Sequence, residues 1–314
     1  MAFKMSLQKS SGKINEVMIG TGEKSIKLGG ENVLPFYSFD GDTGNIQKVG
    51  IEINDIYPDS WIDCYKEMYK DVGNDPATWA KYVQDNTESD FICLRFVGAD
   101  PNGEDKSPEE CAKVAKNVSD AVDLPLVIAG CGVAEKDGKL FAKVSEVLEG
   151  KNVLILSAIE DNYKEVGAAA GLAYGQKVGA ESSVDINLAK QMNVLLTQLG
   201  VKSENIVMNV GYSAVGYGYE YVASTMDRIK LAAFNQNDKQ LQIPIITPVS
   251  FDVSHVKEAI ADESDQPEWG GSEKRSIAME VSTATAVLVG GADAVILRHP
   301  ESIKTIKSFI SELA

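Results

Sequence analysis

The chain has 314 residues, 44% of them hydrophobic and 24% charged, and it carries a formal net charge of −16. These values describe a folded protein with a large core, and the negative field excludes nucleic acid and anionic lipid as expected partners. The sequence has no run of 18 apolar residues and no apolar block of a signal peptide near its start. It therefore predicts a cytoplasmic protein without a membrane span.

The first part of the chain differs in pattern from the rest. Residues 15–30 show the glycine-punctuated alternation of a short hairpin, and an extended segment follows it. We expect residues 1–47 to form an N-terminal segment that packs on a main domain of residues 48–314.

Eight apolar runs follow in the main domain. Each is a near-continuous series of valine, isoleucine and leucine, which is typical of strands buried on both faces. The runs are Lys48–Asn54, Asp90–Val97, Leu124–Cys131, Asn152–Ala158, Gln176–Ser183, Asn205–Gly211, Ile243–Ser250 and Asp293–His299.

Helical patterns lie between these runs. Ser107 and Pro108 predict the cap and first turn of one helix. Two later helices repeat apolar residues at helical spacing. Their expected buried faces are Leu188, Met192, Leu195 and Leu199 in the first, and Val222, Met226, Ile229 and Ala233 in the second. Eight strands alternating with helices predict an α/β fold, a TIM (β/α)8 barrel with an N-terminal hairpin extension, in preference to an open doubly wound sheet.

Two glycine-rich stretches look like phosphate loops but lack a required residue. In "GTGEKS" (residues 20–25), Glu23 stands where a P-loop needs glycine before its lysine. Gly216 and Gly218 supply G-x-G, but Tyr221 occupies the third glycine position of a dinucleotide fingerprint. The tyrosines in this stretch either pack the rim of the barrel or form a platform for a broad ligand or partner, and the sequence leaves both open.

The cysteines and histidines do not form a recognisable motif. The spacing of the cysteines lacks the close pairs of cluster and zinc sites, so it favours buried thiols. Two histidines are too few for a multi-histidine metal site, and we expect both to be satisfied polar residues rather than catalytic ones. These residues are Cys64, Cys93, Cys111, Cys131, His255 and His299.

Three stretches together carry a family resemblance. They are "IKLGGENVLPFYSFDG" (Ile26–Gly41), "IEINDIYPDSW" (Ile51–Trp61) and "GYGYEYVASTMDRIKLAA" (Gly216–Ala233). With them the chain resembles, over nearly its whole length, the small subunit of the corrinoid iron–sulfur protein, which is the delta subunit of the CO dehydrogenase/acetyl-CoA synthase system.

The resemblance implies a function in the reductive acetyl-CoA (Wood–Ljungdahl) pathway. The small subunit of that family is a TIM barrel, and it forms a heterodimer with a large subunit that carries an iron–sulfur cluster and a mobile corrinoid domain. The corrinoid lies between that domain and the top of the small-subunit barrel. The heterodimer takes a methyl group from methyltetrahydrofolate through a separate methyltransferase and donates it to acetyl-CoA synthase.

The ends of the expected strands then suggest which residues face the corrinoid. A corrin is broad and apolar with amide edges, so its cover needs backbone and small polar groups rather than strong acids, and we expect no catalytic residue or metal ligand on this chain. The expected corrinoid contacts are Asn209, Gly211, Tyr212, Ser213, Thr247 and Arg298.

Two other functions remain in view. A barrel that acts directly on methyltetrahydrofolate as a corrinoid methyltransferase is the main alternative, since the fold supports it and Asp185 and Asn187 could contact a pterin. A lyase or aldolase barrel is less favoured, because that chemistry often needs a lysine at a strand end and none of the eight runs ends in one.

Overall fold

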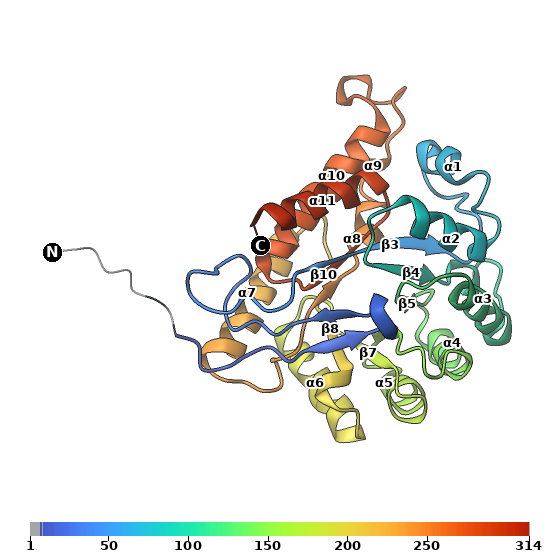
Figure 1. The fold of residues 1–314 in the computed structure, drawn as a ribbon. Helices are drawn as coiled ribbons and strands as arrows, with labels where there is room; N and C mark the ends of the chain where they lie inside the picture. The colour runs from blue at the N-terminus through green and yellow to red at the C-terminus, as the bar shows by residue number, and fades with distance from the viewer. Residues whose placement is uncertain (1–6, 8, 314) are drawn as a thin grey trace.

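Eight parallel strands form a barrel in the computed structural model, which describes residues 7 and 9–313. Their order in the sheet is β8-β7-β6-β5-β4-β3-β10-β9, and a parallel bridge between Met208 and Ile245 brings the two ends of the sheet together (Figure 1). The predicted α/β barrel is confirmed. The strands are β3 (Lys48–Asn54), β4 (Phe91–Arg95), β5 (Leu126–Ala129), β6 (Leu154–Ala158), β7 (Lys177–Glu181), β8 (Ile206–Asn209), β9 (Ile246–Thr247) and β10 (Ala294–Leu297).

Helices surround the barrel, and each strand is followed by at least one of them (Figure 1). None of the described helices is both long and apolar enough to cross a membrane. The α-helices are α1 (Asp63–Tyr69), α2 (Pro76–Asn86), α3 (Pro108–Ala121), α4 (Ala134–Val147), α5 (Tyr163–Val166), α6 (Ile186–Leu199), α7 (Tyr219–Asn235), α8 (Val249–Val253), α9 (Lys257–Ile260), α10 (Ser272–Gly290) and α11 (Pro300–Leu313). A π-helical turn, η3 (Gly167–Ala173), continues α5, and 3-10 turns occur at η1 (Gly22–Lys24), η2 (Val97–Ala99), η4 (Ser203–Asn205) and η5 (Pro267–Trp269).

The sequence patterns predicted the cap of α3 and the buried face of α7 correctly, but not the buried face of α6. Ser107 caps α3 in a capping box with Glu110, and the predicted face of α7 is fully buried. The predicted buried face of α6 is wrong by a small rotation about the helix axis. Met192 is buried as predicted, but its fully buried neighbours are Ala189, Asn193 and Leu196. The Asn193 side chain turns inward because its Nδ2 donates to the carbonyl of Gln240 at 2.8 Å.

A hairpin closes the amino end of the barrel. Strands β1 (Val17–Ile19) and β2 (Ile26–Leu28) pair antiparallel, as predicted, and the side chain of Asn152, just before β6, donates to the carbonyls of Met18 and Gly20. The apolar residues of the hairpin pack against the first inward-facing residues of the strands, so they continue the barrel core. The members of this inner cluster include Val17, Ile19, Ile26, Leu28, Phe91, Leu154, Val207, Ile246 and Ala294.

A buried ion-pair triad holds the N-terminal segment to the barrel. Lys230 of α7 is fully buried and pairs with Glu31 of the N-terminal segment and with Asp293, which precedes β10 and lies 3.4 Å from its Nζ. Burial, and then the charge of Asp293, raise the pKa of Glu31 to about 7, although Lys230 opposes this shift. The triad therefore joins three distant segments; the division of the chain at residue 47 stays a prediction.

Candidate site at the mouth of the barrel

Charged and amide side chains occupy inward-facing positions near the carboxyl ends of several strands. Inward residues alternate with residues that face the helices, so the apolar interior formed by residues such as Phe91 and Cys93 ends in a polar layer. We call this layer the mouth. Its inward side chains are Glu52 on β3, Arg95 on β4, Glu181 on β7, Asn209 on β8 and Arg298 directly after β10.

One half of the mouth is an ion-pair cluster. Nη2 of Arg298 donates to both carboxylate oxygens of Glu52, at 3.0 and 3.1 Å, and Nη1 of Arg95 lies 3.6 Å from Oε1 of Glu52. Burial by itself would raise the pKa of Glu52, but the charges of Arg298 and Arg95 outweigh it and the pKa is lowered. Glu52 is thus a fully buried carboxylate that stays ionised between two guanidinium groups.

Aromatic side chains and a second carboxylate hold Arg298 in place. Its guanidinium carbon lies 3.8 Å from the centre of the Trp61 ring, which is a close cation–π contact. Its backbone N–H donates to Glu280 of α10 at 2.7 Å, and its carbonyl accepts from the hydroxyl of Tyr69 at 3.4 Å. Burial raises the pKa of Glu280. Arg298 is therefore positioned from three sides.

The other half of the mouth is an amide-centred network. Nδ2 of Asn209 donates to Ser157 and to Glu181, each at 3.1 Å, while its Oδ1 accepts from the backbone N–H of Gly211 at 3.2 Å. Burial raises the pKa of Glu181. All three of these hydrogen bonds join the asparagine side chain to protein groups, so it orders the loop that follows β8.

Two aromatic residues connect these halves. Phe251 of α8 lies beneath the guanidinium of Arg95, 4.0 Å from its carbon, and its ring meets the ring of Tyr212 edge-on at 5.9 Å. Tyr212 has a pKa raised by its burial and by Glu181. The contact series Arg298–Glu52–Arg95–Phe251–Tyr212 crosses the mouth.

A cavity of about 350 Å³ opens beside the ion-pair cluster. Its volume is in the range of small-molecule sites. Its lining combines charged, apolar and hydroxyl groups. The lining residues are Glu52, Asn54, Ser60, Trp61, Ile62, Arg95, Val97, Ser254, His255, Ile260 and Arg298.

The structure separates the six residues predicted to contact the corrinoid. Arg298 lines the cavity, while Asn209 and Tyr212 lie across the mouth from it. Gly211 has a positive φ of 91°, and a side chain there would meet Val184. The hydroxyl of Ser213 donates to the carbonyl of Tyr217, so it closes its own loop. Thr247 is fully buried in register with Val295 of the outer core, between the strands and the helices, so its side chain faces the helices, and its hydroxyl has no hydrogen-bond partner among the described residues.

Sequence reasoning missed Glu52, Trp61 and Glu181 as members of this site. The available signal was a charge inside an apolar strand, as in "KVGIEIN" and "KVGAE", because a carboxylate in such a run is buried and requires a partner. Trp61 carried no comparable signal, since its position over Arg298 depends on the path of the loop before α1.

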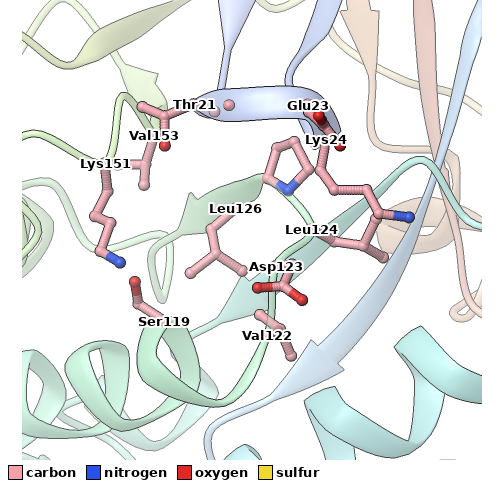
Figure 2. A pocket seen from close by; sticks show the side chains of 13 residues that line it. Thr21, Glu23, Lys24, Ser119, Val122, Asp123, Leu124, Leu126, Lys151 and Val153 are labelled. Carbon is pink, nitrogen blue, oxygen red and sulfur yellow. The ribbon is translucent and has the colours of Figure 1, made fainter.

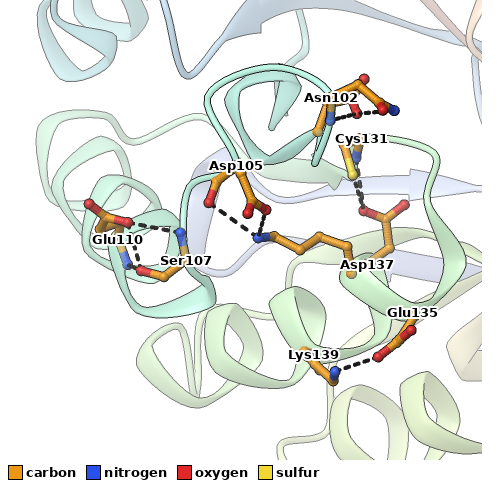
Figure 3. A network of polar contacts seen from close by, with 10 residues as sticks. Asn102, Asp105, Ser107, Glu110, Cys131, Glu135, Asp137 and Lys139 are labelled. Carbon is orange, nitrogen blue, oxygen red and sulfur yellow. Dashed lines mark hydrogen bonds and ion pairs between the residues drawn. The ribbon is translucent and has the colours of Figure 1, made fainter.

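The loop after β5 is ordered by Asp137. The two oxygens of this carboxylate accept from the backbone N–H groups of Cys131 and Gly132 at 2.8 and 2.9 Å, and the thiol of Cys131 points to it at 3.2 Å (Figure 3). Burial raises the pKa of Asp137. Nearby, Lys136 joins this segment to the preceding β4–α3 loop through Asp105 at 2.6 Å. These contacts make the β5 side of the mouth rigid.

The four cysteines are free thiols, and we expect them to react slowly. Burial raises the pKa of Cys131 and of Cys111 to about 12, and that of Cys64 to about 11. Because the thiolate is the reactive form, Cys131 of the folded chain should be alkylated by iodoacetamide at pH 7.5 on the order of a thousandfold more slowly than in urea. Peptide mass spectrometry over time measures this rate; a reaction that levels off below pH 9 would contradict it.

A second cavity, of about 420 Å³, lies at the amino end of the barrel under the turn of the hairpin. Figure 2 shows Glu23 and Lys24 of the turn above residues that lead into β5 and β6. The lining contains two lysines, Lys24 and Lys151, and two carboxylates, Glu23 and Asp123. The balanced charge gives no preference for a phosphate, in keeping with the missing P-loop glycine.

Comparison with protein families supports one assignment. The family model of the CO dehydrogenase/acetyl-CoA synthase delta subunit matches residues 16–307. The acetyl-CoA decarbonylase/synthase complex subunit delta of Archaeoglobus fulgidus is 31% identical over 313 residues, which covers 96% of this chain and 69% of that protein. The proteins of the same name from Methanocaldococcus jannaschii and Methanothermobacter thermautotrophicus are each 32% identical, with 96% and 97% of this chain and 74% and 77% of theirs covered.

Solved structures share the fold at low sequence identity. Dihydropteroate synthase from Xanthomonas albilineans superposes with a TM-score of 0.59 at 10% identity, covering 95% of this chain and 98% of that one. The Yersinia pestis enzyme gives 0.55 at 11% identity, with the same coverage. At this identity the likeness supports the barrel fold alone.

Proposed function

The chain belongs to the family of CO dehydrogenase/acetyl-CoA synthase delta subunits, and from this we propose that it is the small subunit of a heterodimeric corrinoid iron–sulfur methyl carrier in the reductive acetyl-CoA pathway. In this proposal the mouth of the barrel covers a corrinoid held by the large subunit, which also carries the iron–sulfur cluster. The observation that carries the proposal is the family match over residues 16–307, which includes all eight barrel strands.

The residues at the mouth fit such a cover. Tyr212 and Phe251 offer flat apolar surface, Gly211 has no side chain to hold its backbone away, and Arg298 adds hydrogen-bonding groups at the cavity. Aromatic faces, close backbone approach and a few hydrogen-bonding groups are what a broad ring with amide edges requires. These residues, with Asn209 and Ser213 around them, would hold one face of the ring.

The chain's own contribution in this proposal is binding and shielding. When bound, the corrinoid supplies a cobalt centre that accepts and releases a methyl group. Both ring nitrogens of His299 already have partners, at Glu273 and at the backbone of Glu301, so this buried histidine stays within the protein. The mouth residues would exclude water from the ring and keep it oriented while a methyltetrahydrofolate:corrinoid methyltransferase and acetyl-CoA synthase dock in turn.

Anaerobic co-purification with the large subunit tests the proposal. We expect a corrinoid spectrum and cobalt in the heterodimer and neither in this chain alone. Tyr212→Ala should weaken the complex with the corrinoid-loaded large subunit about tenfold, since aromatic residues at the centre of an interface carry much of the binding energy. Tyr82→Ala is the matched control, because Tyr82 is an exposed tyrosine on α2.

Two results would overturn the proposal. A preparation of this chain alone with full cobalt occupancy would show that it holds the corrinoid itself. Methyl transfer from methyltetrahydrofolate to free cob(I)alamin by this chain alone would instead support the methyltransferase alternative.

A further inference from the structure

Among the described residues, Arg95 is the arginine of the ion-pair cluster whose guanidinium makes no hydrogen bond, whereas Arg298 bonds to Glu52 through its Nη2 and leaves its Nε without a partner. The Nε of Arg95 is buried without a partner, and the approach of Arg95 to Glu52, at 3.6 Å, is an ion pair only. Arg298 already donates to both oxygens of Glu52. Leaving a guanidinium without acceptors in a partly buried place is unfavourable, so Arg95 is arranged to bind an acceptor from outside the chain.

The geometry around Arg95 keeps it available. Its guanidinium rests on the ring of Phe251, which fixes the plane of its donors, and its side chain is 22% exposed. The cavity of about 350 Å³ lies directly beside it. A flat guanidinium with free N–H groups at the wall of a cavity is suited to a bidentate oxyanion.

The local charge favours a single negative charge on the occupant. Two arginines, Arg95 and Arg298, and one carboxylate, Glu52, line the cavity together with the imidazole of His255, so the arginines exceed the carboxylate by one positive charge. Other carboxylates around the mouth are committed elsewhere: Asp137 accepts from the loop after β5, Glu181 accepts from Asn209, and Glu280 accepts from the backbone of Arg298. A surplus of one charge matches a carboxylate better than a phosphate dianion.

The rest of the lining suggests what the carboxylate is attached to. Trp61, Ile62, Val97 and Ile260 give the cavity apolar walls, and Ser60 and Ser254 add hydroxyl groups. We propose that this cavity is a binding site for a small organic carboxylate with a short apolar body, whose carboxylate is held by Arg95. This inference concerns the chain alone and does not depend on the proposed corrinoid partner.

Ligand titrations on the full chain test it. Benzoate and acetate are the probes, benzamide and acetamide are their uncharged counterparts, and ligand-observed NMR with Trp fluorescence reports binding. Benzoate should bind at least about tenfold more tightly than benzamide, because the charge-assisted bond to Arg95 is lost in the amide. The difference should shrink as ionic strength rises.

Variants assign the effect to Arg95. Arg95→Met should weaken benzoate binding about tenfold or more, Arg95→Lys should weaken it less, and Arg228→Met, which removes an exposed arginine of α7, should leave it unchanged. The Arg298–Glu52 pair remains in each variant, and circular dichroism checks that each is folded.

Three outcomes would overturn the inference. They are no benzoate binding to the wild-type chain, equal affinity for benzoate and benzamide, and unchanged benzoate affinity in folded Arg95→Met. Tighter binding of inorganic phosphate than of benzoate would also overturn the assignment to a carboxylate. If Arg95→Met does not fold, the wild-type comparison of acid with amide still decides the question.

Discussion

Replacing Lys230 by methionine should lower the free energy of unfolding by about 3–5 kcal/mol at pH 8, because it leaves two buried carboxylates without their counter-charge. The two are Glu31 and Asp293, which the fully buried Nζ of Lys230 now neutralises. Methionine keeps the length and the helix propensity of the side chain. The loss should therefore report the missing charge rather than a cavity.

The loss of stability caused by Lys230→Met should depend on pH, and the pKa of Glu31 gives the direction of that dependence. Folding raises the pKa of Glu31 to about 7, first through burial, and removing Lys230 removes an interaction that lowers it. A carboxyl group with a raised pKa binds its proton more readily in the folded chain, so the folded state loses stability as the pH rises through that value. The decrease in the free energy of unfolding caused by Lys230→Met should therefore be larger at pH 8 than at pH 5.5.

Urea unfolding followed by circular dichroism at these two pH values measures the effect. Lys81→Met is the control, since Lys81 pairs with Asp85 on the exposed face of α2 at 2.8 Å and should cost about 0.5 kcal/mol or less. Equal losses in the two variants would refute a special role for the buried triad. So would a Lys230→Met deficit that is independent of pH.

The second large effect is expected for Glu52→Gln. The amide preserves shape but removes the only carboxylate between Arg298 and Arg95, so we expect a loss of about 3–5 kcal/mol at pH 7. The pKa of Glu52 is lowered in the folded state, and its stabilisation is therefore full above the unfolded value of about 4.3 and is lost as the pH falls through the folded value. The difference between wild type and variant should shrink in acid.

Thermal and urea unfolding at pH 7 and pH 4 provide the measurement for Glu52→Gln. Glu220→Gln removes an exposed carboxylate from the first turn of α7 and serves as its control. If Glu52→Gln is as stable as this control at pH 7, the cluster at the mouth contributes nothing to stability and must be explained by binding alone.

The sequence predicted the barrel because strands buried on both faces leave continuous apolar runs, and each of the eight runs contains its strand. Strand extent was less predictable. The run Ile243–Ser250 pairs over only Ile246–Thr247, since Pro244 and Pro248 flank it and proline cannot donate to a strand ladder. The buried face of α6 was displaced for a tertiary reason, the bond from Asn193 to a loop 47 residues away in sequence.

The site was less predictable than the fold. Rim positions follow from strand ends, so Arg298 and Asn209 could be placed at the mouth in advance. Their partners could not, because Glu52 meets Arg298 only when the first and last strands of the barrel become neighbours, 246 residues apart in sequence. Trp61 reaches the same arginine from a loop whose path no local pattern determines.

The hairpin that closes the amino end of the barrel restricts how a ligand can reach the cavity at the opposite end. Because β1 and β2 cover the inner cluster and Asn152 holds them there by hydrogen bonds, the barrel is closed at its amino end and open only at the mouth. A small carboxylate could reach Arg95 only through the mouth, which is the surface that the proposed corrinoid partner would cover. The small carboxylate would then bind and dissociate only while the partner is not bound. The lifetime of the complex with the partner would therefore limit the rate at which the carboxylate in the cavity exchanges.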